Sequence, residues 1–284
     1  VDVVPYGLPE SAPQGSNHFI KGRWPGIGLN DLLVLWGGGL WPWLDPLTAI
    51  RAVSKVSQRR NDVRLVFPGT RHPNPEMTGI PTHNQAARDL AQEKGLLNKV
   101  VFFGEWIPYR HWPKVLTESD LALTLHYDTL ETRLAFRSRV LDYIWVGLPT
   151  VATRGDATSS LIERYGLGAV VDYEDAESVA GAMLKLLKTP SNQFDRRFDR
   201  ARKELTWERA AEPLLAFCRR SRRAPDKIAL RERIGNPFYL RKQQQLTQKL
   251  HKCRERVKQY EQGRFVRLMR WLDRMRGEVF DHCD

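Results

Sequence analysis

Two charged side chains three positions apart, Arg139 and Asp142, have the chemistry to hold a nucleotide. The pattern of the sequence predicts a helix over 138–146, and residues three apart lie on one face of a helix. A cation near a helix start can bind a phosphate together with the free backbone amides there, and a carboxylate one turn on can accept hydrogen bonds from ribose hydroxyls. A surface ion pair, which contributes less than about 1 kcal/mol, has the same spacing.

Three consecutive glycines, Gly37, Gly38 and Gly39, form a second candidate for ligand binding. They directly follow an apolar run of strand length, and Asp45 and Pro46 come shortly after them. Asp is a favoured N-cap and Pro is favoured at the first helical position, so a strand, a glycine loop and a capped helix are predicted in that order. Glycine lets the backbone approach a ligand closely, and the loop amides could face a phosphate. The loop matches neither GxGxxG nor a P-loop, so a simple tight turn is the alternative.

Two further loops follow other apolar runs. Arg71 lies in one of them, where it would be either a phosphate ligand or an ordinary exposed arginine. Trp106, Ile107 and Pro108 lie in the other, where backbone groups and an aromatic ring could hold a flat base. The aromatic side chains there are equally consistent with residues of the core or its rim.

These loops would meet only if the runs before them are neighbouring parallel strands. Strands are predicted at 31–36, 63–67, 100–103, 121–125, 149–153 and 169–172. Helices are predicted at 46–59, 84–95, 111–118, 138–146, 157–165 and 175–188. This alternation predicts an α/β fold, a doubly wound parallel sheet with helices on both faces. Ligands of such sheets bind beyond the carboxyl ends of the strands, which is where all four loops would lie.

The formal net charge of +12 is confined to the last third of the chain. Residues 1–190 contain equal numbers of acidic and basic side chains, so the predicted α/β domain is neutral. An evenly basic domain would indicate nucleic acid, which we do not expect as a partner. We predict a candidate nucleotide-binding α/β domain over 1–190, closing helices over 191–224 and a basic helical tail over 225–284, where an anionic partner is expected.

The cysteines predict neither a disulfide framework nor a metal site. Cys218, Cys253 and Cys283 are odd in number, far apart and free of any CxxC spacing, which fits a reducing compartment. His251 and Cys253 could be metal ligands, but the remaining ligands of such a site are not evident. No cofactor is therefore predicted.

The basic tail carries two amphipathic segments. Leu246, Leu250, Cys253, Val257 and Tyr260 alternate spacings of four and three residues, a helix-pairing seam of about two heptads. The segment 264–276 then places apolar side chains on one helical face and most of its arginines on the other. The apolar residues of that face are Phe265, Leu268, Met269, Leu272 and Met275. The tail segment 246–276 is thus predicted to bind either an anionic membrane surface or a partner helix.

The order of these motifs resembles the C-terminal domain of GT-B glycosyltransferases, in particular glycosyltransferase family 4. Residues 3–9 are similar to the family's interdomain linker, and 34–40 to its strand and glycine loop. The stretch LDYIWVGLPTVA at 141–152 resembles its E-A-x-A-x-G-x-P-V-V-A signature. The matches extend over about residues 3–188, and their common order is more specific than any one of them.

The resemblance implies a glycosyltransferase that moves a sugar from a nucleoside diphosphate donor to an acceptor hydroxyl. Asp142 stands where the family has the carboxylate that binds the ribose, and Arg139 matches a basic residue of one subgroup. Glu131 resembles the acidic residue that contacts the donor sugar, although Leu134 occupies the position that the family's usual E-x7-E spacing would give it. Glu131 is the predicted catalytic residue. The predicted donor-binding residues are Gly37, Gly38, Gly39, Arg71, Trp106, Ile107, Pro108, Phe136, Arg137, Arg139 and Asp142.

The chain departs from the family where the diphosphate is bound. Gly39 and Leu44 stand in place of an Arg and a Lys, so Arg71, Arg137, Arg139 and the loop amides are the candidates to meet that charge. Many members of the family need no metal, which agrees with the expected absence of a cofactor. A non-catalytic nucleotide-sugar-binding module is an alternative, as is an epimerase or phosphorylase relative of the same fold.

The resemblance also bears on what lies beside this domain. Residues 1–5 have the pattern of a strand in progress, so we expect the acceptor-binding N-terminal half of a GT-B enzyme to be missing or supplied by a partner chain. The isolated chain would then be inactive. No apolar run approaches the roughly 20 residues needed to span a bilayer. A cytoplasmic protein is therefore expected, peripheral on the inner face of the membrane if the tail binds lipid.

Overall fold

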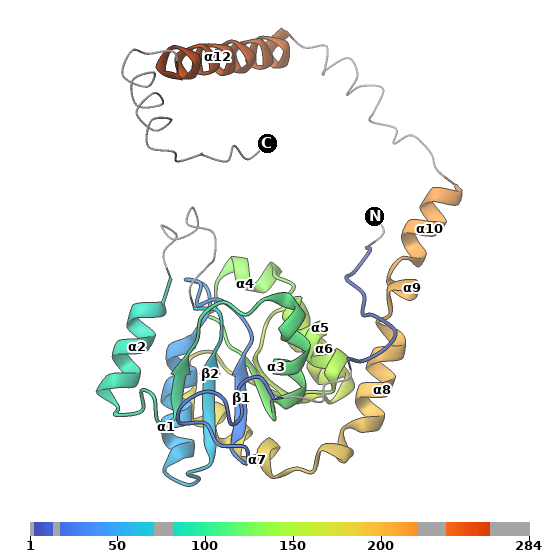
Figure 1. Ribbon diagram of the computed structural model, residues 1–284. Helices are drawn as coiled ribbons and strands as arrows, with labels where there is room; N and C mark the ends of the chain where they lie inside the picture. Colours follow the sequence, from blue (N-terminus) through green and yellow to red (C-terminus); the bar gives the residue numbers. More distant parts are fainter. Residues whose placement is uncertain (1–2, 14–17, 71–81, 221–236, 262–284) are drawn as a thin grey trace, which may run out of the picture. The chain divides into compact units, whose positions relative to one another are not determined.

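The computed structural model describes residues 3–13, 18–70, 82–220 and 237–261 (Figure 1). The chain divides into two units, Val1–Cys218 and Arg219–Asp284, which are described separately. The first unit contains the sheet and the site. The second contains one described helix.

A six-stranded, all-parallel sheet forms the centre of the first unit, as predicted. The strands are β1 (Leu32–Trp36), β2 (Val63–Phe67), β3 (Val101–Phe103), β4 (Leu121–Thr124), β5 (Thr150–Thr153) and β6 (Gly168–Val171). Their order is β3-β2-β1-β4-β5-β6, so the winding direction reverses between β1 and β4. Ligands of doubly wound sheets bind in the crevice at such a reversal, outside the carboxyl ends of the strands.

Helices cover both faces of the sheet, which buries its central strands on both sides (Figure 1). The helices α1 (Pro46–Ser57), α2 (Asn84–Glu93) and α7 (Ala176–Lys188) pack together. On the other face lie α3 (Trp112–Glu118), α5 (Arg139–Val146), α6 (Ala157–Tyr165) and α8 (Asp195–Glu204). Leu33, Val34 and Leu35 of β1 are fully buried, as expected for a strand covered on both faces. The six strands and six helices predicted between residues 31 and 188 all exist, with bounds shifted by no more than two residues.

A short helix, α4 (Leu130–Leu134), occupies a segment that we predicted as a polar loop. Thr129 and Thr132 cap it reciprocally: the Thr132 amide donates to the Thr129 hydroxyl (3.2 Å), and the Thr129 amide donates to the Thr132 hydroxyl (2.9 Å). Such a capping box usually has Glu or Gln at its third helical position. Because Thr132 stands there, the sequence signal for this helix was missed.

The strand expected over 1–5 is not present in its described part. Val3–Pro5 form no strand, and Val3 and Val4 are exposed. Pairing begins at Leu8, which forms an isolated parallel bridge with Thr206 and whose amide donates to the carbonyl of Leu205 (2.7 Å). The N-terminal segment therefore runs along the helices that follow the sheet.

Three α-helices lie in the described residues from 191 to 220, where one or two helices were predicted over 194–223. They are α8, α9 (Trp207–Ala210) and α10 (Glu212–Arg219), after a short 3-10 helix, η3 (Ser191–Gln193). Thr206 caps α9 and so separates it from α8. Phe198 and Ala201 of α8 are buried in the core of the first unit.

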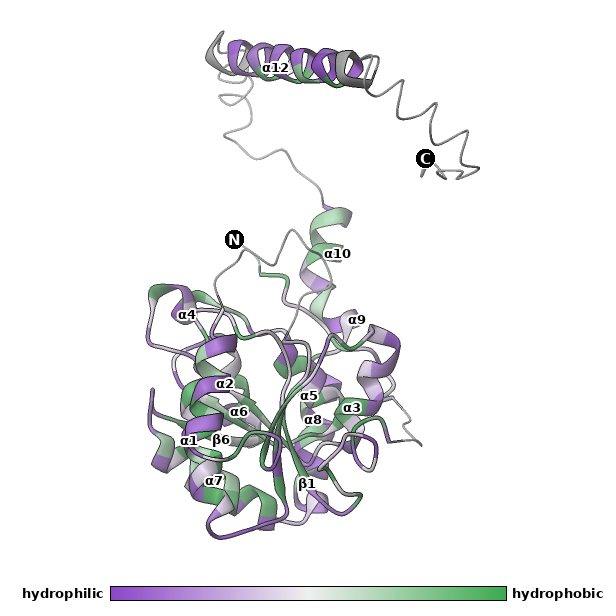
Figure 2. Ribbon diagram, turned by 60° about the vertical axis from the view of Figure 1, so that its left-hand side comes forward, coloured by the Kyte–Doolittle hydropathy of each residue, from purple (hydrophilic) through white to green (hydrophobic). Residues whose placement is uncertain are grey.

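The second unit contains α12 (Pro237–Glu261), a helix of 25 residues. The predicted seam lies on it, with Leu246, Leu250 and Val257 all more than half exposed. Figure 2 shows that hydrophilic residues make up most of its visible surface. No helix in the described residues is both long and apolar enough to traverse a lipid bilayer. Residues 264–276 lie outside the described part of the chain.

Candidate functional site

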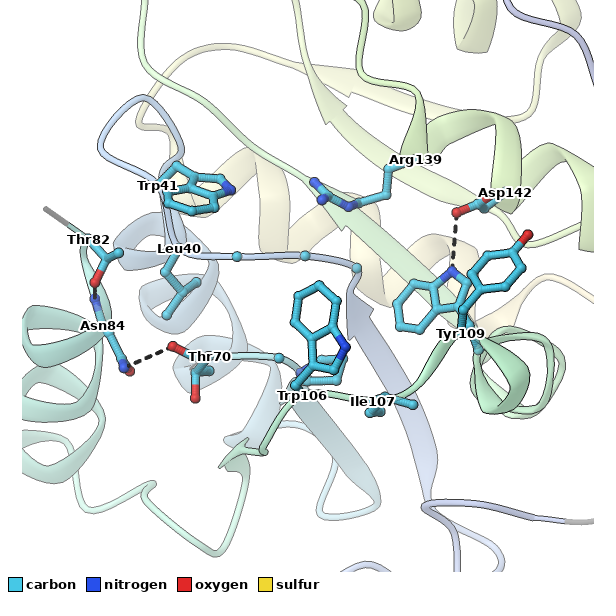
Figure 3. Close-up of a pocket in the computed structure, with 16 residues that line it drawn as sticks. Leu40, Trp41, Thr70, Thr82, Asn84, Trp106, Ile107, Tyr109, Arg139 and Asp142 are labelled. Carbon is cyan, nitrogen blue, oxygen red and sulfur yellow. Dashed lines mark hydrogen bonds between the residues drawn. The ribbon is translucent and has the colours of Figure 1, made fainter. Parts of the chain in front are cut away.

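A cavity of about 580 Å³ opens at the carboxyl edge of the sheet (Figure 3). It is bounded by the loops that follow β1, β2 and β3, by the start of α2, and by the first turn of α5, which follows β4. The residues that line it are Gly37, Gly38, Gly39, Leu40, Trp41, Pro68, Gly69, Thr70, Thr82, Asn84, Trp106, Ile107, Tyr109, Trp112, Arg139 and Asp142. The cavity thus lies beside the reversal of strand order, where this fold binds its ligands.

The glycine loop after β1 leaves room for the side chain of Arg139. A Cβ atom added to Gly38 would overlap the Arg139 guanidinium, and one added to Gly37 would overlap the Tyr143 hydroxyl. The Gly37 amide donates a hydrogen bond to that hydroxyl (3.1 Å). Figure 3 shows the guanidinium lying over the loop and pointing toward Trp41. Glycine at position 38 thus leaves the space that the Arg139 guanidinium occupies, and Arg139 brings positive charge to the loop from the opposite wall.

Asp142 lies one turn further along α5, half-buried at the same cavity. Its carboxylate accepts a hydrogen bond from the Trp112 indole (3.1 Å; Figure 3). Burial raises the pKa of Asp142 above its ordinary value, and the Trp112 hydrogen bond and the charge of Arg139 oppose that rise. A partly desolvated carboxylate of this kind is a strong acceptor for ligand hydroxyl groups.

Aromatic side chains form much of the remaining wall. Trp106 and Tyr109 are exposed at the cavity, whereas Ile107 and Trp112 are partly buried there. Trp41 lies at the far end from Asp142 in Figure 3. Flat apolar surfaces with a few convergent polar groups are typical of sites that bind small organic molecules.

The structure brings together seven of the twelve residues predicted for the site. Those that line the cavity are Gly37, Gly38, Gly39, Trp106, Ile107, Arg139 and Asp142. Pro108, Glu131, Phe136 and Arg137 are not among its lining residues, and Arg71 lies outside the described residues. Arg139 and Asp142 share a face of α5, as their spacing predicted.

Glu131 and Arg137 form an ion pair away from the cavity lining. The Arg137 guanidinium lies 3.2 Å from the Glu131 carboxylate, whose side chain is 52% exposed. The Arg137 side chain is only 10% exposed, and its Nε lies 3.8 Å from Asp156. Phe136 instead packs against Tyr6, with ring centroids 5.7 Å apart.

Asp156 joins this ion pair to the interior of the protein. The Nε2 of buried His126 lies 3.5 Å from its carboxylate, and the Thr158 hydroxyl and Ser159 amide donate to it at 2.8 and 2.6 Å. Burial alone would raise the pKa of Asp156, but the interactions with His126, Ser159 and Thr158 outweigh it and hold the pKa below its ordinary value. A chain of polar contacts therefore connects His126, Asp156, Arg137 and Glu131.

Nine lining residues were not among the predicted site residues. They are Leu40, Trp41, Pro68, Gly69, Thr70, Thr82, Asn84, Tyr109 and Trp112. Six of them lie in or directly beside the loops that had been singled out. Thr82, Asn84 and Trp112 lie at helix starts that follow strands, and such starts face the same sheet edge as the loops. That rule could have identified them.

A family model matches the part of the chain that forms the sheet and its flanking helices. The family model described as "Glycosyl transferases group 1" matches residues 32–189, more than half of the chain. No curated protein sequence matches the chain. The predicted resemblance to GT-B glycosyltransferases is confirmed at the level of this broader family and of the fold; family 4 itself stays a prediction.

Solved structures with the same fold are glycosyltransferases of which this chain covers about half. WaaG, a glycosyltransferase involved in lipopolysaccharide biosynthesis, is 19% identical with a TM-score of 0.55, over 76% of this chain and 55% of WaaG. A glycosyltransferase from Rickettsia africae is 16% identical with a TM-score of 0.54, over 66% and 47% of the two chains. HepE from Anabaena, solved with UDP and glucose, is 16% identical with a TM-score of 0.53, over 66% and 48%. The chain thus spans about half the length of these structures.

Proposed function

The chain belongs to the glycosyl transferases group 1 family, and from this premise we propose that its cavity binds the nucleoside diphosphate sugar donor of a glycosyl transfer reaction. One observation carries the proposal. Arg139 and Asp142, a cation and a carboxylate from one helical turn, meet a glycine loop in a single cavity at the sheet's carboxyl edge. Their chemistry matches the two polar parts of a nucleotide, its diphosphate and its ribose.

Each part of the donor has a counterpart in the cavity. Arg139 and the glycine-loop amides meet the diphosphate, and Asp142 accepts hydrogen bonds from the ribose hydroxyls. Trp106 and Ile107 hold the flat base. HepE, which has the same fold, was solved with UDP, and a nucleoside diphosphate is the ligand that these groups fit.

In the proposed reaction the bond between the sugar's anomeric carbon and the diphosphate oxygen breaks, and a bond to the acceptor oxygen forms. The diphosphate leaves with additional negative charge, and the proton of the acceptor hydroxyl passes to the leaving diphosphate or to solvent. Arg139 stabilises that developing charge at a fixed position, which is the usual way a protein lowers such a barrier. Glu131 remains the predicted contact for the sugar, although it lies beside Arg137 rather than on the cavity wall.

The proposed donor site uses protein groups for the positive charge that a metal ion supplies elsewhere. Arg139 and the loop amides provide it, so nucleotide binding is proposed to be metal-independent. Titrations in EDTA and in magnesium test this point. Equal affinities support it, and loss of binding in EDTA contradicts it.

The acceptor is proposed to bind against a second domain or a partner chain. This chain covers only about half the length of the solved structures, and orientation of both substrates can lower a barrier by several kcal/mol, or roughly 7–11 at best. The 284-residue chain alone should therefore transfer little or no sugar, although it should bind the donor. Robust transfer by the purified chain would refute this assignment.

The basic tail is proposed to hold the protein at an anionic membrane surface. The described helix α12 contains seven basic and two acidic residues, and 264–276 adds five arginines and an apolar face in the sequence. Each basic residue near an anionic surface contributes about 1 kcal/mol. Pairing with another helix is the alternative that the seam on α12 supports.

Titration calorimetry with nucleoside diphosphates tests the donor site. Asp142→Ala and Arg139→Ala should each weaken binding by about 1–3 kcal/mol, because a charged hydrogen-bonding group is lost. The matched control is the exposed pair Asp128–Arg133, whose guanidinium and carboxylate lie 2.7 Å apart outside the cavity. Asp128→Ala and Arg133→Ala should bind as the wild type does. Unchanged affinities for both site variants would rule the assignment out.

A further inference from the structure

The two ends of the cavity differ in chemistry. Arg139 and Asp142 lie toward one end, and both are charged. Toward the other end lie Trp41 and three neutral polar side chains, those of Thr70, Thr82 and Asn84 (Figure 3). A nucleoside diphosphate sugar has the same asymmetry, because its diphosphate is charged and its sugar is a neutral ring with many hydroxyl groups.

Trp41 belongs to a pair of stacked indoles. Its ring and that of Trp43 are 5.7 Å apart between centroids and inclined by only 12°. Trp41 lines the cavity, and Trp43, at 36% exposure, lies behind it and is not among the lining residues. The second ring fixes the orientation of the first, since offset stacking of aromatic rings contributes about 0.5–1.5 kcal/mol beyond burial.

Three hydrogen bonds to backbone carbonyls hold the loop that carries the two indoles, and their donors come from three different parts of the chain. The His83 amide, at the start of α2, donates to the Leu40 carbonyl (2.7 Å). The Tyr127 amide, after β4, donates to the Trp43 carbonyl (3.3 Å), and the Trp36 indole of β1 donates to the Gly39 carbonyl (3.3 Å). Trp41 is thus held on a rigid wall, which a binding surface requires for precision.

Polar groups face the same space as Trp41. The Asn84 side-chain amide donates to the Thr70 carbonyl (3.2 Å), and the Asn84 backbone amide donates to the Thr82 hydroxyl (3.4 Å; Figure 3). The Arg88 guanidinium donates to the Asn84 side-chain oxygen (3.1 Å), which fixes the orientation of that amide. Amide and hydroxyl groups beside an aromatic face can hydrogen-bond the hydroxyls of a sugar whose C–H face rests on the ring.

We propose that Trp41, backed by Trp43, is the surface on which the transferred sugar of the donor rests, with Asn84 and Thr82 at the sugar's edge. The order of residues along the wall supports this placement. Asp142, Arg139 and Trp41 follow one another in Figure 3, so a donor with its ribose at Asp142 and its diphosphate at Arg139 brings its sugar to Trp41. The inference rests on the proposed function and adds the subsite that selects the sugar.

The test compares a nucleoside diphosphate with its sugar conjugate by titration calorimetry. UDP with UDP-glucose and GDP with GDP-mannose are titrated first, and the pair that binds more tightly is used for the variants. Trp41→Leu should leave the affinity for the free diphosphate within about twofold and lower that for the sugar conjugate about 3- to 10-fold. Trp41→Tyr, which keeps an aromatic face, should restore most of the loss.

Trp106→Leu is the matched control, because Trp106 is another tryptophan of the same cavity and is proposed to hold the base. It should weaken the diphosphate and its sugar conjugate by the same factor. Trp43→Leu removes only the backing ring and should give a smaller loss, again confined to the sugar conjugate. This variant also preserves the test if Trp41→Leu does not fold, which a thermal melt of each variant will show.

Three distinguishable outcomes would overturn either the sugar subsite at Trp41 or the proposed function itself. Equal weakening of both ligands by Trp41→Leu would place the nucleotide itself on Trp41 and overturn the inference. No change for either ligand would also overturn it, because the ring would then contact neither. Failure of the wild type to bind either diphosphate would overturn the proposed function, and the sugar subsite with it.

Discussion

Gly38 and Arg139 depend on each other, although 101 positions separate them in the sequence. The guanidinium occupies the space in which any other residue at position 38 would place its Cβ atom. The glycine therefore serves to admit a side chain of the same protein, in addition to any close approach by a ligand. Glycosyltransferase family 4 has an arginine where this chain has Gly39. The chain can dispense with that arginine because Arg139 of α5 supplies positive charge at the same loop.

Replacing Gly38 with alanine should therefore damage the site selectively. Gly38→Ala should displace Arg139 and weaken nucleoside diphosphate binding by about 1–2 kcal/mol, as expected when a charge-assisted contact is lost. Gly181→Ala is the matched control: Gly181 lies in α7 with open space around it, so the change should raise stability by about 0.5–1 kcal/mol and leave binding alone. Full affinity in Gly38→Ala would show that Arg139 does not hold the ligand.

Asp142 should show a conflict between stability and binding. The pKa of Asp142 is raised in the folded protein, chiefly by burial. The protonated carboxyl therefore stabilises the fold at pH values below its ordinary pKa of 3.8, and this stabilisation is lost as the pH rises through the pKa of the folded state. At neutral pH the ionised carboxylate is thus a net cost to the empty protein. Asp142→Asn should raise the melting temperature slightly at pH 7 and weaken nucleotide binding by about 1–3 kcal/mol.

Scanning calorimetry and titration calorimetry on the same Asp142→Asn sample check both effects. The amide oxygen can still accept the Trp112 hydrogen bond, so packing against α3 is preserved. A melting temperature lowered by several degrees together with normal nucleotide binding would make Asp142 a structural residue.

Two kinds of signal made site residues predictable from the sequence. Gly38 was found because apolar runs mark the strands and the chain order then places the loops at one edge, whereas Asp142 was found from its spacing to Arg139 on a predicted helix. Trp41 and Thr82 lie at the same edge, beside the glycine loop and at the start of α2, but that they face one cavity depends on contacts between segments that the sequence does not relate. The contact of His83 with the loop of Trp41, which joins α2 to the segment after β1, is such a case.

At the level of elements, the sheet was predictable and its exceptions have local causes. The fully apolar β1 is recognisable because it is buried on both faces, where no polar alternation is needed. The helix α4 was missed because its cap uses Thr132 where Glu or Gln is usual. Glu131 therefore lies on a helix and pairs with Arg137, and the spacing of residues in the sequence does not predict this pair.

The helix α6 begins at a carboxylate that connects several elements. Asp156 caps α6 through the Ser159 amide, and its carboxylate also lies near His126 after β4 and Arg137 before α5. Its pKa is lowered in the fold, because the polar contacts outweigh the effect of burial. The stability that it contributes is therefore present above its ordinary pKa of 3.8 and is lost as the pH falls through the lower, folded value.

Asp156→Asn separates the cap from the charge. Asn caps helices about as well as Asp, so the helix end should survive while the charged contacts are lost. The variant should be destabilised by about 2 kcal/mol at pH 7, and by progressively less as the pH falls below 4. Urea unfolding between pH 3 and pH 7 measures this difference. Asp175→Asn, at the exposed cap of α7, should have the smaller effect. A loss that does not vary with pH would mean that the charge of Asp156 is irrelevant.

At the scale of the whole molecule, the charge is separated from the site. The first 190 residues are neutral overall, and the surplus of +12 lies after them. This separation agrees with the two proposals made above, donor binding by the first unit and attraction to an anionic membrane by the tail, since a basic extension can supply attraction without altering the site. The apolar side chains Leu246, Leu250 and Val257 of α12 remain exposed within the second unit, so this helix has surface available for either lipid or another helix.

The membrane proposal predicts how the full chain sediments with liposomes. Binding should require anionic lipid, because the arginines at 264, 267, 270 and 274 contribute mainly by charge, and it should fall as salt rises, since the Debye length shortens to about 3 Å at 1 M. Leu268→Glu should abolish it by placing a charge on the apolar face. Thr247→Glu is the control: it adds the same charge within α12 and should retain most of the binding. If the helix pairs with another protein instead, removal of residues 264–284 will leave sedimentation unchanged, and the basic tail must then be assigned to a partner helix.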